Sequence, residues 1–337
     1  MRQMGEHTQG GGSGARELGV AAGVRTTSPS TMWRAGSSAA GPPGRPQATL
    51  LEPGARPYVG SVRGILELLR PALAERYRID REIGRGAMAV VFLAEPVPAG
   101  RLAAIKALRP ELTVVLGAGR FQREVEILGR LSHPGIVPVL ESGIAGSLFY
   151  LVMPYVAGEN LRTCLDRAGP LSVAEVLSIA ADLAPAIDHA HGQRIVHRDI
   201  KPANVLLDGR RALICDFGLA LAIDRAALEP LSSSGLVIGT PAYMSPEQAT
   251  GEETVGTATD IYALGCMIYE MLTGDLPFPG ATPQAMIARR LAEPPRSLRT
   301  VRPDVPARLE AAVMAALARA PSDRPASAAA FMAALAG

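Results

Sequence analysis

A short stretch in the middle of the chain concentrates functional groups that are typical of catalysis. Asp199, Lys201, Asn204 and Asp216 place two carboxylates, one ammonium and one carboxamide within twenty residues, between short apolar runs that are typical of strands. Phosphoryl transfer uses such a set: one carboxylate orients an attacking hydroxyl, a second carboxylate and an amide oxygen hold Mg²⁺, and an ammonium offsets phosphate charge. The stretch therefore predicts phosphoryl-transfer chemistry.

The order and spacing of these groups resemble the protein kinases. The run His197-Arg198-Asp199-Ile200-Lys201-Pro202-Ala203-Asn204-Val205-Leu206-Leu207 is followed by Asp216-Phe217-Gly218, and this pair of motifs is far more specific than either fragment alone. The resemblance implies that Asp199 is the base or orienter for a substrate hydroxyl and that Asn204 and Asp216 bind Mg²⁺. Lys201 is typical of the serine/threonine-specific branch of the family.

An upstream segment predicts the phosphate-binding part of an ATP site. Gly84 and Gly86 lie between two expected strands, where glycine lets the backbone approach phosphate oxygens. Lys106 follows in an otherwise apolar strand, and a lysine that faces a cleft needs a counter-charge. The family spacing favours Glu124 as its partner, with Glu126 as the alternative. Ala89 stands where a third glycine is usual, and the loop is similar to that of the bacterial members of the family.

The segment Leu151–Val156 is similar to the hinge through which protein kinases bind adenine. Pro154 keeps the carbonyl that the family uses, and Val156 would supply the paired N–H donor. Val91, Ala104 and Leu206 would sandwich the base. The full set of expected ATP-binding residues is Ile83, Gly84, Arg85, Gly86, Val91, Ala104, Lys106, Pro154, Val156 and Leu206.

A long segment after the second motif predicts a regulatory loop and a platform for protein substrates. Asp216 to Glu247 spans 32 residues with little periodicity, and such a long loop is usually functional. Ser232, Ser233 and Ser234 are candidate sites of activating phosphorylation, because Arg198 can receive a phosphate.

The segment Gly239–Glu247 matches the serine/threonine-kinase platform, with Ser245 in place of the usual alanine. The resemblance implies that Thr240 hydrogen-bonds near Asp199 and Lys201. It also implies that Glu247 forms a buried ion pair with Arg324. Asp260 lies at the start of an apolar helix. It is expected to brace the segment around Asp199, which we call the catalytic loop.

The elements that must position these residues form a β-rich half followed by an α-rich half. Strands are expected at 77–83, 90–94, 102–108, 137–140 and 148–153, with a helix at 117–131 between them. A capping box of Ser172 and Glu175 opens an amphipathic helix in the second half, which Pro185 is expected to kink. The pattern predicts an α+β, two-lobed protein-kinase fold with the ATP cleft between the lobes.

Composition sets the expected domain boundaries. Residues 1–60 hold 12 of the 35 glycines and many prolines, serines and arginines, a composition that predicts a disordered tail. A lead-in helix at 61–76, with Pro71 interrupting its pattern, precedes the catalytic domain at 77–337. Within that domain we expect an N-lobe at 77–153, a hinge at 154–159 and a C-lobe at 160–337.

The net charge and the cysteines indicate which kinds of binding partner and cellular setting to expect. The net charge of +2 and the dispersed arginines of the tail do not predict nucleic-acid binding. No stretch approaches 18 uninterrupted apolar residues, so no membrane segment is expected. Three widely spaced cysteines suit a reducing, cytoplasmic setting. The expected partners are protein substrates with serine or threonine acceptors and a second copy of the chain for autophosphorylation.

Two alternatives compete with an active serine/threonine protein kinase. A catalytically weak kinase-fold scaffold usually lacks one of the key residues, but Lys106, Glu124, Asp199, Asn204 and Asp216 are all present. A small-molecule phosphotransferase with a similar fold is expected to lack the platform and Asp260. The sequence therefore predicts an ATP- and Mg²⁺-dependent transferase that phosphorylates proteins.

Overall fold

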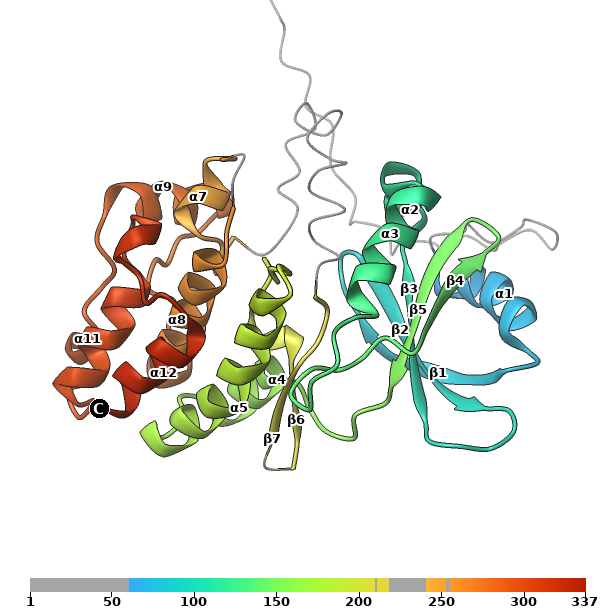
Figure 1. Ribbon diagram of the computed structural model, residues 1–337, viewed down its shortest axis with the longest axis horizontal. Helices are drawn as coiled ribbons and strands as arrows, with labels where there is room; N and C mark the ends of the chain where they lie inside the picture. Colours follow the sequence, from blue (N-terminus) through green and yellow to red (C-terminus); the bar gives the residue numbers. More distant parts are fainter. Residues whose placement is uncertain (1–60, 210, 218–240, 253–254) are drawn as a thin grey trace, which may run out of the picture. The chain divides into compact units, whose positions relative to one another are not determined.

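The computed structural model describes residues 61–337 with the exception of residues 210, 218–240 and 253–254. The first part is an antiparallel sheet with strand order β1-β2-β3-β5-β4. Its strands are β1 (Tyr77–Arg85), β2 (Ala89–Pro96), β3 (Ala103–Leu108), β4 (Glu141–Ala145) and β5 (Leu148–Pro154). Two helices, α2 (Pro110–Leu116) and α3 (Ala118–Leu128), connect β3 to β4 and lie beside the sheet (Figure 1).

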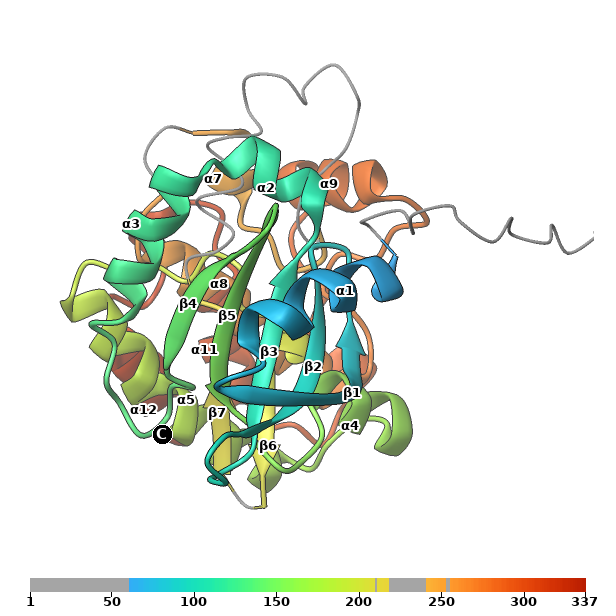
Figure 2. The same ribbon diagram turned by 90° about the vertical axis from the view of Figure 1, so that its right-hand side faces the viewer.

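A helix before the sheet covers one of its faces. Helix α1 (Val62–Leu73) begins at Ser61, whose side chain accepts a hydrogen bond from the backbone N–H of Gly64. Its buried Ile65, Leu69 and Leu73 pack with alternate residues of the strands, such as Phe92 and Ile105. Figure 2 shows α1 lying across the sheet. Because side chains alternate along a strand, the intervening residues of β2, β3 and β5 face the other way.

The remaining chain is mainly helical and packs around one helix. Helix α8 (Ala258–Thr273) is buried along nearly its whole length, and it lies among the other helices in Figure 1. A short antiparallel pair of strands, β6 (Val205–Asp208) and β7 (Arg211–Ile214), lies between the Asp199 and Asp216 motifs. The other elements are α4 (Leu161–Ala168), α5 (Val173–Gly192), η1 (Pro202–Asn204), α7 (Pro246–Ala249), α9 (Pro283–Ala292), α10 (Leu298–Val301), α11 (Ala307–Ala316), η2 (Pro321–Asp323) and α12 (Ala328–Ala336).

Several local expectations are confirmed and one is wrong. The capping box of Ser172 and Glu175 opens α5 as predicted. The strand expected at 137–140 is absent: the N–H of Val137 donates to the carbonyl of Ile214 on β7 at 2.9 Å, and the strand that pairs with β5 begins at Glu141. Helices α1 and α5 both contain their prolines, Pro71 and Pro185, and continue beyond them, since the buried face of each helix is stabilised by packing on both sides of the proline. The expected tail at residues 1–60 lies outside the described residues.

No helix among the residues that the structure describes is both long and apolar enough to cross a membrane.

Candidate active site

The first motif brings a carboxylate, an ammonium and an amide into contact. Lys201 Nζ lies 2.6 Å from Asp199 Oδ2. The side-chain N–H of Asn204 donates to the Asp199 carbonyl at 2.8 Å and to Asp199 Oδ2 at 3.1 Å. Asn204 is buried and lies in the short helix η1, so its amide has little freedom. These contacts hold the Asp199 carboxylate in one orientation beside a positive charge.

The backbone of this loop is held by Asp260 on α8. Asp260 is fully buried, and its Oδ1 accepts from the N–H of Arg198 at 2.8 Å while Oδ2 accepts from the N–H of His197 at 2.8 Å. The ring of His191 is a further partner of Oδ2 at 2.8 Å. Arg198 has a φ of 66°, a left-handed conformation that costs free energy for a residue with a side chain. The prediction that Asp260 braces the loop is confirmed.

The second motif places Asp216 against the lysine of β3. Lys106 Nζ lies 2.6 Å from Asp216 Oδ1. Burial by itself would raise the pKa of Asp216, but the ammonium of Lys106, with smaller effects from His197 and Lys201, lowers that pKa below its ordinary value. Asp216 also has a left-handed φ of 67°. The carboxylate is therefore kept ionised at neutral pH and held in a strained backbone position.

The ammonium of Lys106 is paired with Asp216, whereas the expected partner was Glu124. Asp216 follows β7, so the two members of this ion pair come from different sheets. Glu124 is half-buried on α3. Its neighbours Phe121 and Val125 pack with residues of the sheet, so the helix lies next to the strand of Lys106.

The two expected metal ligands are tied together by the backbone. The N–H of Cys215 donates to the carbonyl of Asn204 at 3.0 Å, so Asp216 follows directly after a contact with Asn204. Because the side-chain N–H of Asn204 points at Asp199, its amide oxygen is left as the atom that can coordinate a cation. An amide oxygen and a carboxylate are oxygen donors of the kind that Mg²⁺ prefers. The donor set therefore fits Mg²⁺.

The glycines of the β1–β2 turn are not required by the protein itself. A Cβ at Gly84 would meet no atom nearer than 3.8 Å, and one at Gly86 none nearer than 3.9 Å. Neither glycine has a positive φ. The lack of side chains leaves open space next to backbone atoms, and a phosphate group can use that space. Ile83 and Arg85 flank it, and Arg85 pairs with Glu82.

The face of the sheet opposite α1 supplies an apolar wall. Val91 is the cross-strand partner of Lys106, and Ala104 is that of Met153, so these residues share a face with the lysine. Leu206 and Val156 pack against the small buried cluster that contains Met153. Pro154 ends β5. Val91 and Ala104 therefore lie on the lysine's face of the sheet, and Val156 and Leu206 pack against the cluster that contains Met153.

The chain that connects the two halves passes very close to β6. A Cβ at Gly158 would lie 1.9 Å from the carbonyl oxygen of Leu207, so only glycine fits there. The N–H of Leu207 donates to the carbonyl of Glu159 at 2.9 Å. Asn160 then caps α4 by accepting from the N–H of Thr163. The linker is thus bonded to the strand that carries Leu206.

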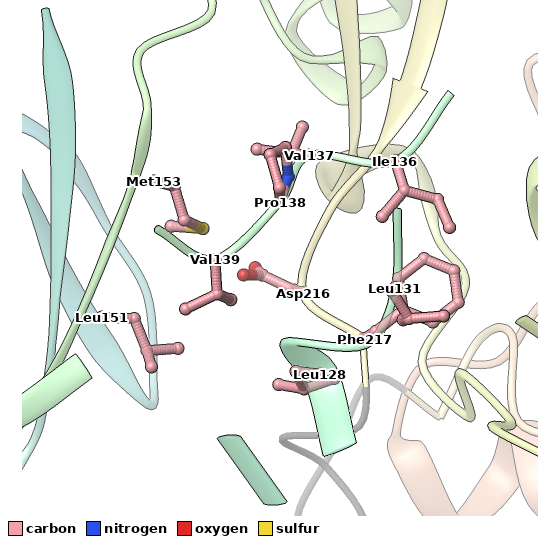
Figure 3. A pocket seen from close by; sticks show the side chains of 10 residues that line it. All are labelled: Leu128, Leu131, Ile136, Val137, Pro138, Val139, Leu151, Met153, Asp216 and Phe217. Carbon is pink, nitrogen blue, oxygen red and sulfur yellow. The ribbon is translucent and has the colours of Figure 1, made fainter. Parts of the chain in front are cut away.

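A mostly apolar pocket lies behind Asp216. Figure 3 shows the Asp216 carboxylate pointing into this pocket, with Val139 and Met153 among the side chains around it. The ring of Phe217 lies 4.5 Å from that of His197, centroid to centroid. Leu128 and Phe217 belong to one buried cluster, against which Val139 packs. Phe217 thus links the ring of His197 to the buried cluster that contains Leu128.

The platform is joined to the C-terminal region by a buried ion pair. Arg324 Nη1 lies 2.7 Å from Glu247 Oε1, as the resemblance implied. Thr240, which was expected to contact Asp199 and Lys201, lies outside the described residues, and so do Ser232, Ser233 and Ser234.

Two residues with contacts to the catalytic loop and the platform were missed in the sequence. Gln248 donates to the carbonyl of Arg198, and the buried Arg290 donates to the carbonyls of Pro241 and Ala242. Local sequence offers no sign of Arg290, since its partners lie almost fifty residues away. Ser245 and Gln248 have the spacing of a capping box, a signal in the sequence that could have found Gln248.

Comparison with known proteins agrees with this geometry. A family model described as "Protein kinase domain" matches residues 77–334. The chain belongs to the protein kinase family. This protein kinase is 38% identical over 280 residues to the serine/threonine-protein kinase pkn3 of Myxococcus xanthus, an alignment that covers 80% of this chain and 51% of that protein. It is also 38% identical over 261 residues to the serine/threonine-protein kinase PknB of Mycolicibacterium smegmatis, covering 75% and 41%.

A solved structure supports the two-lobed kinase fold. A crystal structure of Rad53 residues 1–466 in complex with AMP-PNP superposes with a TM-score of 0.64 and 26% identity, covering 77% of this kinase and 65% of that chain. The kinase described here spans about half, or less, of the length of the curated relatives it matches. Both of these relatives are bacterial, which agrees with the resemblance of the glycine loop to bacterial members of the family.

Proposed function

We propose that this kinase is an active serine/threonine protein kinase that transfers the γ-phosphoryl group of ATP to hydroxyls of proteins. The observation that carries the proposal is the contact set of Asp199, Lys201 and Asn204, together with the Lys106–Asp216 pair across the cleft. The names of the relatives and the AMP-PNP bound to Rad53 support ATP as the phosphoryl donor.

Each group has a defined part in the reaction. Asp199 orients the acceptor hydroxyl and receives its proton, while Lys201 offsets negative charge on the phosphate. Asn204 and Asp216 would hold Mg²⁺, which would neutralise charge on the nucleotide phosphates. Glu124 on α3, a helix that packs against the sheet, is the second carboxylate that we assign as a counter-charge for Lys106. Gly84 and Gly86 leave room for the phosphates.

The remaining expectations belong to the same proposal. Residues 77–337 form the catalytic domain, with an N-lobe at 77–153, a hinge at 154–159 and a C-lobe at 160–337. The end of β5 at Pro154 and the start of α4 at Leu161 support these bounds. Thr240 forms a hydrogen bond near Asp199 and Lys201. One or more of Ser232, Ser233 and Ser234 is phosphorylated by a second copy of the chain. The three free cysteines support a reducing, cytoplasmic setting.

Labelled ATP tests the proposal directly. The full chain, with Mg²⁺, is expected to phosphorylate itself and a generic basic protein on serine or threonine. Asp199→Asn is expected to lower the rate by about 10²- to 10⁴-fold, because it removes the base but keeps the size of the side chain. Mass spectrometry of the product would locate the modified residues. Retained nucleotide binding without transfer in the wild-type chain would instead favour the kinase-fold scaffold.

A further inference from the structure

A side chain of the platform helix α7 reaches the catalytic loop. Gln248 is the third residue of α7, and its Nε2 donates to the carbonyl oxygen of Arg198 at 2.9 Å. Arg198 directly precedes Asp199 and has the left-handed φ of 66°. Its N–H is already bonded to Asp260 at 2.8 Å. The amide of Gln248 therefore holds the second backbone polar group of a strained residue.

The orientation of the Gln248 amide is set by its partners. Its Oε1 accepts from the N–H of Ser245 at 3.0 Å and from the hydroxyl of Thr259 at 2.9 Å. A backbone N–H can only donate and the Arg198 carbonyl can only accept, so the oxygen and nitrogen of the amide cannot exchange places. Ser245 and Thr259 are buried, and their hydroxyl oxygens are 2.5 Å apart. These contacts fix the donor on Arg198.

We propose that Gln248 is a positioning residue for the transfer reaction, which holds the Arg198 carbonyl so that the Asp199 carboxylate keeps its catalytic orientation. A capping box needs only an acceptor at this position, and glutamate serves as well as glutamine. The contact with Arg198 needs a donor, which an ionised glutamate lacks. The requirement for glutamine therefore comes from the catalytic loop and not from the helix. This inference rests on the proposed function.

Gln248→Glu separates the two roles. The variant keeps the cap of α7 but places a carboxylate against the Arg198 carbonyl. We expect kcat at pH 8 to fall about tenfold or more, with KM for ATP within about twofold of wild type, since losing a donor to a strained backbone group is costly. When the introduced carboxyl group is protonated, its O–H can donate again. The ratio of variant to wild-type kcat is therefore expected to rise as the pH is lowered from about 8 to about 5.5.

Glu175→Gln is the matched control. Glu175 completes the same kind of capping box with Ser172 on α5, where its carboxylate accepts from both the N–H and the hydroxyl of Ser172. This exchange of glutamate and glutamine is expected to leave kcat and its pH profile unchanged. A kcat for Gln248→Glu within about twofold of wild type at pH 8, or a loss that does not vary with pH, would overturn the proposal.

A measurement that does not depend on catalysis tests this inference separately from the proposed function. Backbone amide exchange of the peptide that contains His197–Asp199 is expected to be faster in Gln248→Glu than in the wild type, whether or not the chain transfers phosphate. If the wild type transfers no phosphate, the proposed function fails. If amide exchange of this peptide is the same in Gln248→Glu and in the wild type, the inference about Gln248 fails. Should Gln248→Glu not fold, Gln248→Met, which lacks both donor and charge, is measured for kcat and exchange in the same way.

Discussion

Arg324 donates two hydrogen bonds to the carboxylate of Glu247, at 2.7 and 2.8 Å, although 77 residues separate them in the chain. Both side chains are almost fully buried, at 0% and 4% exposure. Arg324 also donates to the carbonyls of Ala258 and Ala318, and its guanidinium lies 4.9 Å from the ring centroid of Tyr262. The pair joins the platform helix α7 to the helices that end the chain.

Removing the cation of this pair is expected to destabilise the fold. In Arg324→Met the buried Glu247 loses its counter-charge, and we expect the free energy of unfolding to fall by about 3 to 5 kcal/mol. Chemical denaturation measures it. The control is Arg78→Met, which breaks an ion pair with Glu95 between side chains that are 77% and 47% exposed and is expected to cost less than about 1 kcal/mol. Equal effects of the two substitutions would contradict the prediction.

The same pair predicts a dependence of stability on pH. Burial raises the pKa of Glu247, but the hydrogen bonds from Arg324 outweigh it, so the pKa in the folded state lies below its ordinary value of 4.5. The folded state therefore binds fewer protons at this group, and its contribution is complete above pH 4.5 and lost as the pH falls through the folded-state pKa.

The stability difference between wild type and Glu247→Gln measures this contribution. It is expected to shrink as the pH falls from about 7 to about 3, because protonation removes the charge that glutamine lacks already. Denaturation at several pH values checks it. A difference that stays constant over this range would show that the carboxylate is not stabilised by Arg324.

The glycine turn predicts a substitution that affects ATP and not the fold. A Cβ at Gly86 would meet no protein atom nearer than 3.9 Å, so Gly86→Ala is expected to leave the melting temperature unchanged. KM for ATP is expected to rise about fivefold or more, roughly 1 kcal/mol, because the methyl group occupies space next to the phosphates. Steady-state kinetics and thermal melting measure the two quantities.

Gly158→Ala is the control for Gly86→Ala, because at Gly158 a side chain is expected to clash with the protein itself. Its Cβ would lie 1.9 Å from the Leu207 carbonyl oxygen, so the melting temperature is expected to fall. If Gly86→Ala also lowered the melting temperature, the turn would be held by the protein and not shaped for a ligand.

The buried Arg290 predicts an effect on protein substrates. Its guanidinium donates to the carbonyls of Pro241 and Ala242 at 2.7 and 2.8 Å and to the hydroxyl of Tyr262 at 3.1 Å. Lysine cannot bond both carbonyls in this geometry. Arg290→Lys is expected to raise KM for a peptide substrate about five- to tenfold, with little change in KM for ATP.

Arg302 provides a matched control for Arg290. One of its nitrogens donates to the carbonyls of Leu171 and Leu272, at 2.5 and 2.8 Å, away from the platform. Arg302→Met removes both hydrogen bonds, and it is expected to lower stability without raising KM for the peptide. A similar rise in both variants would mean that Arg290 acts only through the stability of the fold.

Much of the candidate site could be predicted because its signals are local. Asp199, Lys201 and Asn204 lie within six residues, so their order alone indicates that their side chains share a loop. The alternation of β3 likewise places Ala104 and Lys106 on one face. The strand expected at 137–140 was wrong because an apolar run does not reveal its partner: the N–H of Val137 donates to Ile214 of β7, and β4 begins only at Glu141.

The sequence by itself predicted the groups that this kinase is expected to use, namely the carboxylate of Asp199, the oxygens of Asn204 and Asp216 and the ammonium of Lys106, and it predicted the capping box that begins α5. Only the tertiary structure decided which carboxylate lies against Lys106, and that Gln248 and Arg290 bond carbonyls of the catalytic loop and platform. Caps and motifs depend on residues a few positions apart, whereas these contacts depend on how whole helices pack, and packing is set by burial summed over the entire core.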